Sequence, residues 1–198
     1  MIIWINGAFG SGKTTTAFEL HRRLENSFVY DPENVGYFIR KNAPQNFSKG
    51  DFQDILLWRE MNYKILKLIS SEYDGIIIVP MTLVNPDYYG EIIDKLIGDG
   101  VEVKHFILYA DRATILKRLK SRSPFGLRSE SFAVNSIDRC IYSFDNHIKD
   151  VKIITDDKKI GEVVDEIAQK SDIKLTADNR SGIKKIFDRV GTFINHIR

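Results

Sequence analysis

The sequence contains a single cysteine, Cys140, among 198 residues, so an internal disulfide is impossible. The small disulfide-dependent domains that are common among secreted proteins are therefore excluded. No apolar run approaches the roughly 20 residues that a membrane-spanning helix needs. The apolar start, 1–5, is also too short for the apolar region of a secretory leader. Together these absences predict a cytoplasmic protein.

An excess of charge of one sign is absent as well. The 29 lysines and arginines nearly balance the 27 aspartates and glutamates, which gives a net charge of +2. This balance argues neither for nor against a nucleic-acid partner, and we predict none. The length and the 43% hydrophobic content suit one α/β domain and do not suffice for two.

The sequence does contain a phosphate-binding loop. Residues 7–14 read Gly-Ala-Phe-Gly-Ser-Gly-Lys-Thr, which matches the pattern Gly-x-x-x-x-Gly-Lys-Ser/Thr directly after the apolar run. The glycines let backbone N–H groups surround a polyphosphate, and the following helix adds the positive end of its dipole. Lys13 supplies a cation for the β- and γ-phosphates, and the Thr14 hydroxyl is placed to bind Mg²⁺. We therefore predict ATP and Mg²⁺ as cofactors, bound by Gly7, Ala8, Phe9, Gly10, Ser11, Gly12, Lys13, Thr14 and Thr15.

Short β-rich runs alternate with longer helical stretches, an order typical of a parallel sheet covered by helices. We predict strands over 1–5, 28–30, 75–79, 103–109 and 152–154, and helices over 13–25, 51–72, 88–98, 111–122 and 159–170. Ser48 and Asp51 are spaced as a capping box for the second helix. The predicted fold class is α/β, a three-layer P-loop NTPase fold with a five-stranded parallel sheet. The kinase-like domain is expected over 1–171, followed by a C-terminal helix in 172–198.

Two acidic residues follow the second predicted strand. Ligands of open parallel sheets bind at the carboxyl ends of the strands, so Asp31 and Glu33 should face the same crevice as Lys13. A carboxylate there can accept a proton from an attacking hydroxyl or hold a Mg²⁺-bound water. The same residues flank Pro32 where a helix can begin, and acids stabilise the first turn of a helix. Catalysis and helix capping both stay open for this pair.

A loop rich in serine, proline and glycine, 123–132, separates two helices that carry arginines. Arg118 and Arg122 are four residues apart and so share one face of the first helix, and Arg139 lies on the second. Arginine can stabilise the charge on a transferring phosphoryl group. We predict a lid over about 118–139 that closes over bound phosphates. The alternative for these arginines is a solvated basic face.

A carboxylate is missing at the end of the third predicted strand, which reads Val79-Pro80-Met81-Thr82. Many P-loop enzymes place an acidic residue here to hold the water shell of Mg²⁺. Thr82 and Asn85 are polar at this position but carry no charge. Their neutrality weakens the case for fast ATP hydrolysis.

The helix predicted over 51–72 carries a polar and aromatic group, Trp58, Arg59, Asn62 and Tyr63. Such a group either belongs to the core or lines a pocket. Near the acceptor, Arg59 would suit an anionic or sugar-like substrate, and otherwise it is a surface arginine.

The segment 180–198 is basic, with Arg180, Lys184, Lys185, Arg189 and Arg198 against Asp188, five positive charges minus one negative charge, a net of +4. Apolar residues recur between them at helical spacing. A basic amphipathic helix of this kind can lie on an anionic membrane surface or pack on the domain. Both alternatives stay open, and the chain is expected to be a monomer or a homodimer.

With these residues identified, the chain resembles the bacterial tunicamycin-resistance protein family. These are P-loop ATP-binding proteins related in fold to nucleoside-monophosphate kinases and chloramphenicol phosphotransferases. The similar segments are 1–14, 16–24, 30–33, 78–82, 137–140 and 195–198. They span nearly the whole chain, and the neutral strand end at 79–82 is itself part of the resemblance.

The resemblance implies a nucleoside-monophosphate-kinase-like fold with an arginine-bearing lid, and protection against tunicamycin, an antibiotic built from uracil and sugars. It implies that Asp31 matches the catalytic carboxylate of chloramphenicol phosphotransferases. Arg118 and Arg122 match the paired lid arginines of adenylate kinases, and the loop at Thr155 resembles the place where those kinases contact adenine. Lys13, Asp31, Arg118 and Arg122 would then be catalytic. Phosphorylation of a tunicamycin-like nucleoside or sugar and its sequestration without chemistry are both compatible with the resemblance.

Overall fold

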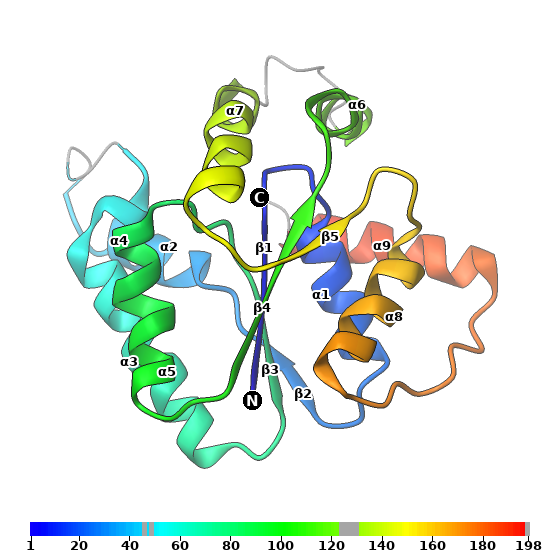
Figure 1. The fold of residues 1–198 in the computed structure, drawn as a ribbon, viewed down its shortest axis with the longest axis horizontal. Helices are drawn as coiled ribbons and strands as arrows, with labels where there is room; N and C mark the ends of the chain where they lie inside the picture. The colour runs from blue at the N-terminus through cyan, green and yellow to red at the C-terminus, as the bar shows by residue number, and fades with distance from the viewer. Residues whose placement is uncertain (45–46, 48–49, 123–130, 197–198) are drawn as a thin grey trace.

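The computed structural model describes residues 1–44, 47, 50–122 and 131–196 (Figure 1). The side chains of residues 122, 186, 189, 190 and 193–196 fall outside this description. Five parallel strands form one sheet in the order β2-β3-β1-β4-β5. Their bounds are β1 Ile2–Gly7, β2 Ser27–Val29, β3 Ile76–Pro80, β4 Val103–Tyr109 and β5 Val151–Ile154. The predicted α/β fold and its five strands are confirmed.

Helices cover both faces of the sheet, and α6 and α7 lie beyond the carboxyl ends of its strands (Figure 1). The α-helices are α1 Lys13–Arg22, α2 Glu33–Lys41, α3 Leu56–Glu72, α4 Pro86–Tyr89, α5 Lys95–Gly98, α6 Arg112–Arg122, α7 Ser131–Asn146, α8 Ile160–Ser171 and α9 Gly182–His196. A 3₁₀ turn, η1, spans Phe52–Asp54, and a π-helical turn, η2, spans Gly90–Asp94. In Figure 1, α1, α8 and α9 lie on one side of the sheet and α2 to α5 on the other.

The core follows from a sheet that is buried on both faces. Every residue of β1 is buried, which explains why the strand reads as a continuous apolar run rather than an alternating one. Trp4 packs with Trp58 and Leu66 of α3 on one face. Ile5 packs with Leu20 of α1 and other residues on the opposite face. The central position of β1 fixes the start of the phosphate loop at the carboxyl edge of the sheet.

The prediction of one helix over 51–72 is wrong at its start. Ile55 adopts an extended conformation, with φ −82° and ψ 115°, and separates η1 from α3. Asp51 caps η1 instead, because its carboxylate accepts a hydrogen bond from the N–H of Gln53 at 3.1 Å. Ser48, the other half of the predicted capping box, lies outside the described residues. The helix predicted over 88–98 consists of α4, η2 and α5.

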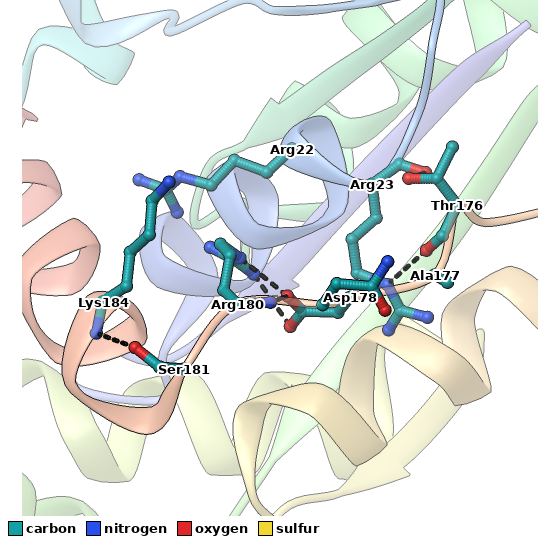
Figure 2. Close-up of a pocket in the computed structure, with 9 residues that line it drawn as sticks. Arg22, Arg23, Thr176, Ala177, Asp178, Arg180, Ser181 and Lys184 are labelled. Carbon is teal, nitrogen blue, oxygen red and sulfur yellow. Dashed lines mark hydrogen bonds and ion pairs between the residues drawn. The ribbon is translucent and has the colours of Figure 1, made fainter.

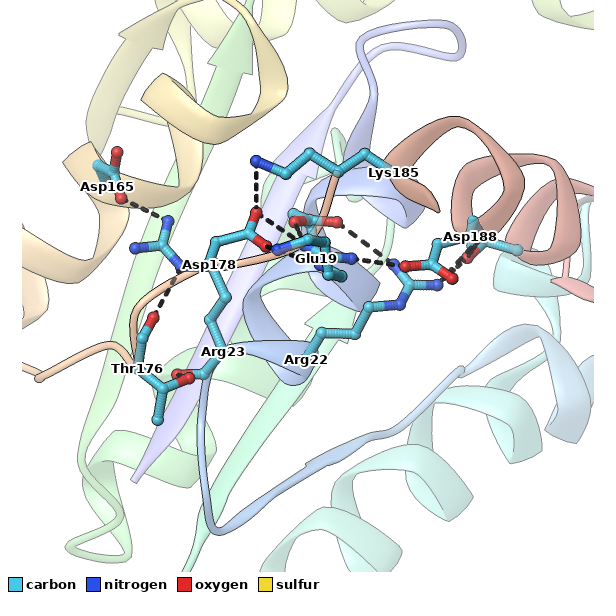
Figure 3. Close-up of polar contacts among 10 residues, drawn as sticks. Glu19, Arg22, Arg23, Asp165, Thr176, Asp178, Lys185 and Asp188 are labelled. Carbon is cyan, nitrogen blue, oxygen red and sulfur yellow. Dashed lines mark hydrogen bonds and ion pairs between the residues drawn. The ribbon is translucent and has the colours of Figure 1, made fainter. Parts of the chain in front are cut away.

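The C-terminal helix packs on the domain through a network of charges (Figure 3). Arg180 forms ion pairs with Glu19 of α1, with Asp178 and with Asp188 of α9. Arg22 of α1 donates to the carbonyl oxygen of Asp188 at 3.1 Å. Of the two alternatives for this helix, packing on the domain is therefore observed.

An open cavity of about 410 Å³ lies beside this network, between the end of α1 and the segment 176–184 (Figure 2). Within the described residues, no helix combines the length and apolar character needed to cross a membrane. The side chains of Ile183 and Phe187 are 69% and 71% exposed. The helix thus uses charges to dock and leaves apolar side chains in solvent.

Candidate functional site

The phosphate loop connects β1 to α1. Gly7 has a φ of 147°, and Gly10 and Gly12 also have positive φ angles. A Cβ atom at Gly7 would lie 2.5 Å from the Oγ of Ser11 and 2.7 Å from the carbonyl oxygen of Leu108. Because both contacts are closer than real Cβ atoms allow, only glycine fits this turn. The backbone at Gly7 therefore packs closely against Ser11 and Leu108, as a loop that surrounds a phosphate requires.

Lys13 and Thr14 begin α1 directly after the loop. The Nζ of Lys13 donates to the carbonyl oxygen of Ala8 at 3.1 Å and lies 5.3 Å from the centre of the Phe9 ring. The ammonium group is thereby held across the mouth of the loop. Thr14 and Thr15 occupy the first turn of α1, where N–H groups of the helix have no partner within the helix.

A cavity of about 310 Å³ adjoins the loop and is lined by residues that include Ser11, Thr16, Arg118, Thr155 and Lys158. In the part of the chain that the structure describes, the buried hydroxyl oxygens of Ser11 and Thr16 have no hydrogen-bond partner. A buried polar atom without a partner is costly, and a bound polar ligand would supply one. This cavity therefore fits a polar group bound beside the phosphate loop.

Arg118 and Thr155 meet at this cavity. The guanidinium of Arg118 donates to the Oγ1 of Thr155 at 2.9 Å and to its carbonyl oxygen at 2.5 Å. Thr155 is buried directly after β5, and its N–H donates to the carbonyl oxygen of Tyr109 in β4. The structure thus brings together two of the residues predicted to bind the nucleotide. The side chain of Arg122 and residues 123–130 of the predicted lid lie outside the described residues.

The acidic pair after β2 lies at the other side of the loop. The carboxylate of Asp31 accepts a hydrogen bond from the N–H of Glu33 at 3.0 Å, so it does cap the first turn of α2. A carboxylate can accept several hydrogen bonds, so this one does not by itself exclude a chemical role. The carboxylate of Glu33 accepts a bond from the hydroxyl of Tyr37 at 3.2 Å. Capping and a chemical role are therefore compatible for Asp31.

The charge of Lys13 in the phosphate loop acts on these acids. Burial raises the pKa of Glu33, the negative charge of Asp31 raises it further, and the positive charge of Lys13 lowers it. Asp51 also raises the pKa of Glu33. Charges affect each other in this way only at short range, so Lys13 and the acids lie near one another. The region between the loop and α2 therefore contains a cation and several carboxylates.

Asp51, expected only as a helix cap, and Arg139, expected in the lid, lie near the same groups. Burial raises the pKa of Asp51, and the charge of Arg139 on α7 lowers it. Lys13, Arg139 and Asp51 all act on the pKa of the buried thiol of Cys140, which burial raises. Asp51 therefore both caps η1 and faces the crevice. No local signal could have assigned Asp51 to the crevice, because its neighbours there come from α1, α2 and α7.

Polar residues after β3 have structural partners. The buried hydroxyl of Thr82 donates to the carbonyl oxygen of Gly7 at 2.9 Å. The side chain of Asn85 accepts from the N–H groups of Asp87 and Tyr88 and caps α4. Both side chains support the local fold, and the edge of the sheet at β3 has no carboxylate.

The polar and aromatic group on α3 belongs to the core. The indole of Trp58 is fully buried and donates to the carbonyl oxygen of Pro32 at 3.0 Å. Arg59 is 8% exposed, forms an ion pair with Glu91 at 2.5 Å and donates to the carbonyl oxygen of Gln53 at 2.6 Å. Arg59 thus holds η1 against η2, and the idea that it recognises the acceptor has no support in its contacts.

Comparisons with known proteins agree with this geometry. A family model described as "AAA domain" matches residues 2–146. The tunicamycin resistance protein of Deinococcus radiodurans is 30% identical, with a TM-score of 0.74, over 89% of this chain and 99% of that protein. The chain belongs to the AAA domain family and to the tunicamycin-resistance proteins. A search of curated proteins finds no match.

The tunicamycin-resistance proteins share their fold with small-molecule kinases. The APS kinase of Mycobacterium tuberculosis, solved with AMPPNP and APS, has a TM-score of 0.57 at 17% identity, over 86% of this chain and 96% of that chain. The shikimate kinase of Aquifex aeolicus has a TM-score of 0.52 at 21% identity, over 87% of this chain and 96% of that chain. At these identities the likeness establishes the P-loop kinase fold alone.

Proposed function

We propose that the chain is an ATP-dependent phosphotransferase that acts on a hydroxyl of a nucleoside- or sugar-like molecule, with tunicamycin as the candidate acceptor. The observation that carries the proposal is that Lys13, after β1 and the phosphate loop, and Asp31, after β2, both lie at the carboxyl edge of one parallel sheet. A cation for the transferred phosphate and a carboxylate for the acceptor proton are the two groups that phosphoryl transfer needs side by side. The name of the Deinococcus radiodurans relative supports the acceptor class.

On the donor side, ATP would lie with its phosphates in the loop and its nucleoside in the cavity lined by Arg118 and Thr155. The unpartnered hydroxyls of Ser11 and Thr16 support a polar ligand there. The proposed nucleotide contacts are residues 7–15, Arg118 and Thr155.

Magnesium fits the donor set at the start of α1. The described residues contain no cluster of three or more His, Cys, Asp or Glu side chains able to hold a metal. Mg²⁺ keeps much of its water shell and binds with nucleotide phosphates, so the Thr14 hydroxyl suffices as a direct protein ligand. When bound, the ion would neutralise charge on the β- and γ-phosphates.

On the acceptor side, Asp31 is the proposed base. Its carboxylate takes the proton of the acceptor hydroxyl as that oxygen bonds to the γ-phosphorus, and the bond from the γ-phosphorus to the bridging oxygen of ADP breaks. Lys13, Arg118 and Arg122 are proposed to stabilise the negative charge on the transferring group. The bond from the N–H of Glu33 holds the Asp31 carboxylate in place.

The charges of the crevice also favour a neutral acceptor. Asp31, Glu33 and Asp51 lie near one another there, and Lys13, Arg40 and Arg139 are the cations that act on them. Several carboxylates would repel an acceptor that already carries a phosphate or carboxylate, whereas they accept hydrogen bonds from hydroxyls. A sugar or nucleoside fits this chemistry.

The test is transfer of label from γ-labelled ATP to tunicamycin. Asp31→Asn should lower the transfer rate by at least about 100-fold and leave ATP affinity nearly intact, because it removes only the base. Lys13→Ala should abolish ATP binding. Bound but unmodified tunicamycin after prolonged incubation would refute the phosphotransferase. Equal losses of ATP affinity in the two variants would assign Asp31 to the metal site.

The second candidate is ATP-dependent sequestration of the drug at a membrane surface. It is favoured by the missing carboxylate after β3, where Thr82 is bonded to Gly7, and by the exposed apolar side chains of Ile183 and Phe187 on α9. A basic helix with exposed apolar residues can contact anionic lipid while its other face stays docked. In the same assay this candidate predicts retention of intact drug in the presence of ATP.

A further inference from the structure

A buried histidine lies one hydrogen bond away from the phosphate loop. His105 of β4 is 6% exposed, and its Nε2 lies 3.1 Å from the Nδ2 of Asn6 in β1. Its other ring nitrogen, Nδ1, lies 2.8 Å from the Oδ2 of Asp150, out of line with the ring N–H direction. The hydroxyl of Tyr89 donates to the same carboxylate oxygen at 2.7 Å. The proposed function gives these residues no role.

Asn6 anchors the start of the phosphate loop. Its Oδ1 accepts hydrogen bonds from the N–H of Gly7 at 2.8 Å and from the N–H of Leu83 at 2.9 Å. Its Nδ2 donates to the carbonyl oxygen of Leu83 at 2.7 Å. The amide thus joins the end of β1 to the segment after β3. A reversed amide would direct its NH₂ group at two N–H donors, so the backbone fixes which atom is oxygen.

The orientation of Asn6 determines the protonation of His105. One hydrogen of Nδ2 is used by Leu83, and the other points to the Nε2 of His105. Since Nδ2 can only donate here, Nε2 must accept and carries no proton. The single ring proton of the neutral histidine is then on Nδ1, beside Asp150.

We propose that His105 is a positioning residue for the phosphate loop, which it supports through Asn6 only as the neutral Nδ1–H tautomer, so that protonation of His105 weakens nucleotide binding. The nucleotide part of this inference rests on the proposed function. A proton on Nε2 would face the NH₂ group of Asn6, and two donors cannot bond. Asn6 would then have to move, and with it the N–H of Gly7 that it holds.

Among the described residues, two titratable groups contact the imidazole of His105. Asp150 precedes β5, and the close contact of its carboxylate with His105 holds the pKa of that carboxyl below its usual range. Tyr89 of α4 packs its ring edge-to-face on the imidazole, with the ring centres 5.2 Å apart, and burial raises the pKa of its hydroxyl. The charge of Asp94 in η2 also raises the pKa of Tyr89. Asp150 and Tyr89 stay in one protonation state in mild acid, so a pH effect that disappears in His105→Gln is assigned to position 105.

The first test compares MgATP affinity between pH 8.0 and pH 5.5. ATP itself titrates in this range, so the measured quantity is the ratio of the wild-type Kd to the variant Kd at each pH. In His105→Gln, an amide oxygen can accept from Asn6 and does not titrate. The wild-type Kd divided by the Kd of His105→Gln should rise by about tenfold from pH 8.0 to pH 5.5. This is the change expected for the loss of one buried hydrogen bond. A ratio independent of pH would overturn the proposal.

Two further variants separate the hydrogen bond from packing. His105→Leu fills the site but offers no acceptor, so at pH 8.0 it should weaken MgATP binding by about tenfold relative to His105→Gln. Equal affinities of these two variants would refute the role of the bond. His147→Gln is the matched control, because His147 is exposed on the loop after α7. The wild-type Kd divided by the Kd of this variant should not change with pH. Absence of MgATP binding by the wild-type protein at every pH would instead refute the proposed function.

The tautomer itself can be measured without nucleotide or variants at position 105. Long-range ¹H–¹⁵N spectra of the imidazoles distinguish Nδ1–H, Nε2–H and imidazolium forms, and the signals are assigned by replacing the three other histidines of the four in the chain. At pH 7.5, His105 should give the Nδ1–H pattern. An Nε2–H or imidazolium pattern would overturn the inference even if nucleotide binding is never detected.

Discussion

Gly7→Ala should damage the phosphate loop and leave the rest of the fold intact. The new Cβ would lie 2.7 Å from the carbonyl oxygen of Leu108, whereas ordinary contact begins at 3.4 Å, so the backbone must move by the difference, 0.7 Å. The φ of 147° is also strained for alanine. We expect a loss of at least about 2 kcal/mol of unfolding free energy and a Tm lower by about 4–8 °C. Displaced N–H groups should weaken MgATP binding by at least about tenfold.

The assay is thermal unfolding followed by nucleotide titration on the same preparation. Gly161→Ala is the matched control, since Gly161 lies in α8 and no heavy atom is within 4 Å of its added Cβ. This substitution should raise stability by about 0.5–1 kcal/mol and leave nucleotide binding unchanged. If Gly7→Ala binds MgATP and unfolds like the wild-type protein, the steric argument for the loop is wrong.

Two other predictions concern the crevice and the C-terminal helix. Because folded Glu33 has a pKa above its ordinary 4.5, it binds its proton more tightly than the unfolded chain does, and its stabilising contribution is lost as pH rises from 4.5 through the folded pKa. Glu33→Gln removes this loss, so urea unfolding at several pH values should show the variant gaining stability over wild type as pH rises, and a pH-independent difference would contradict the shift. Ile183→Ser combined with Phe187→Ser should abolish sedimentation with anionic vesicles if α9 contacts lipid through these exposed side chains, and equal pelleting of variant and wild type would reject that contact.

Local patterns in the sequence were sufficient to predict the strands of the sheet and the phosphate loop. The apolar runs at 1–5 and 75–79 become β1 and β3 because both faces of the sheet are buried, and that burial leaves a signal in consecutive residues. The glycines and Lys13 of the loop have a fixed spacing that local geometry imposes. Asp31 could be placed near Lys13 because strands of a parallel sheet end at the same edge.

Contacts between distant segments could not be predicted. Arg180 and Glu19 are 161 positions apart, and nothing in either neighbourhood indicates that they pair. The pattern of 180–198 is therefore compatible both with a membrane surface and with packing on the domain, and the contacts of Arg180 are what distinguish them. His105 gave no signal, because its role depends on Asn6 and Asp150 from other strands and loops. Side-chain pairing across the sheet is decided by packing and not by spacing along the chain.

The position of Trp58 makes intrinsic tryptophan fluorescence a probe of acceptor binding. The chain has two tryptophans, and both are fully buried. Trp4 donates to the carbonyl oxygen of Met81, the residue directly after β3. Trp58 instead donates to the carbonyl oxygen of Pro32, the residue between Asp31 and Glu33. A change in the emission of Trp58 when an acceptor binds would therefore report on the acidic residues after β2 without any label.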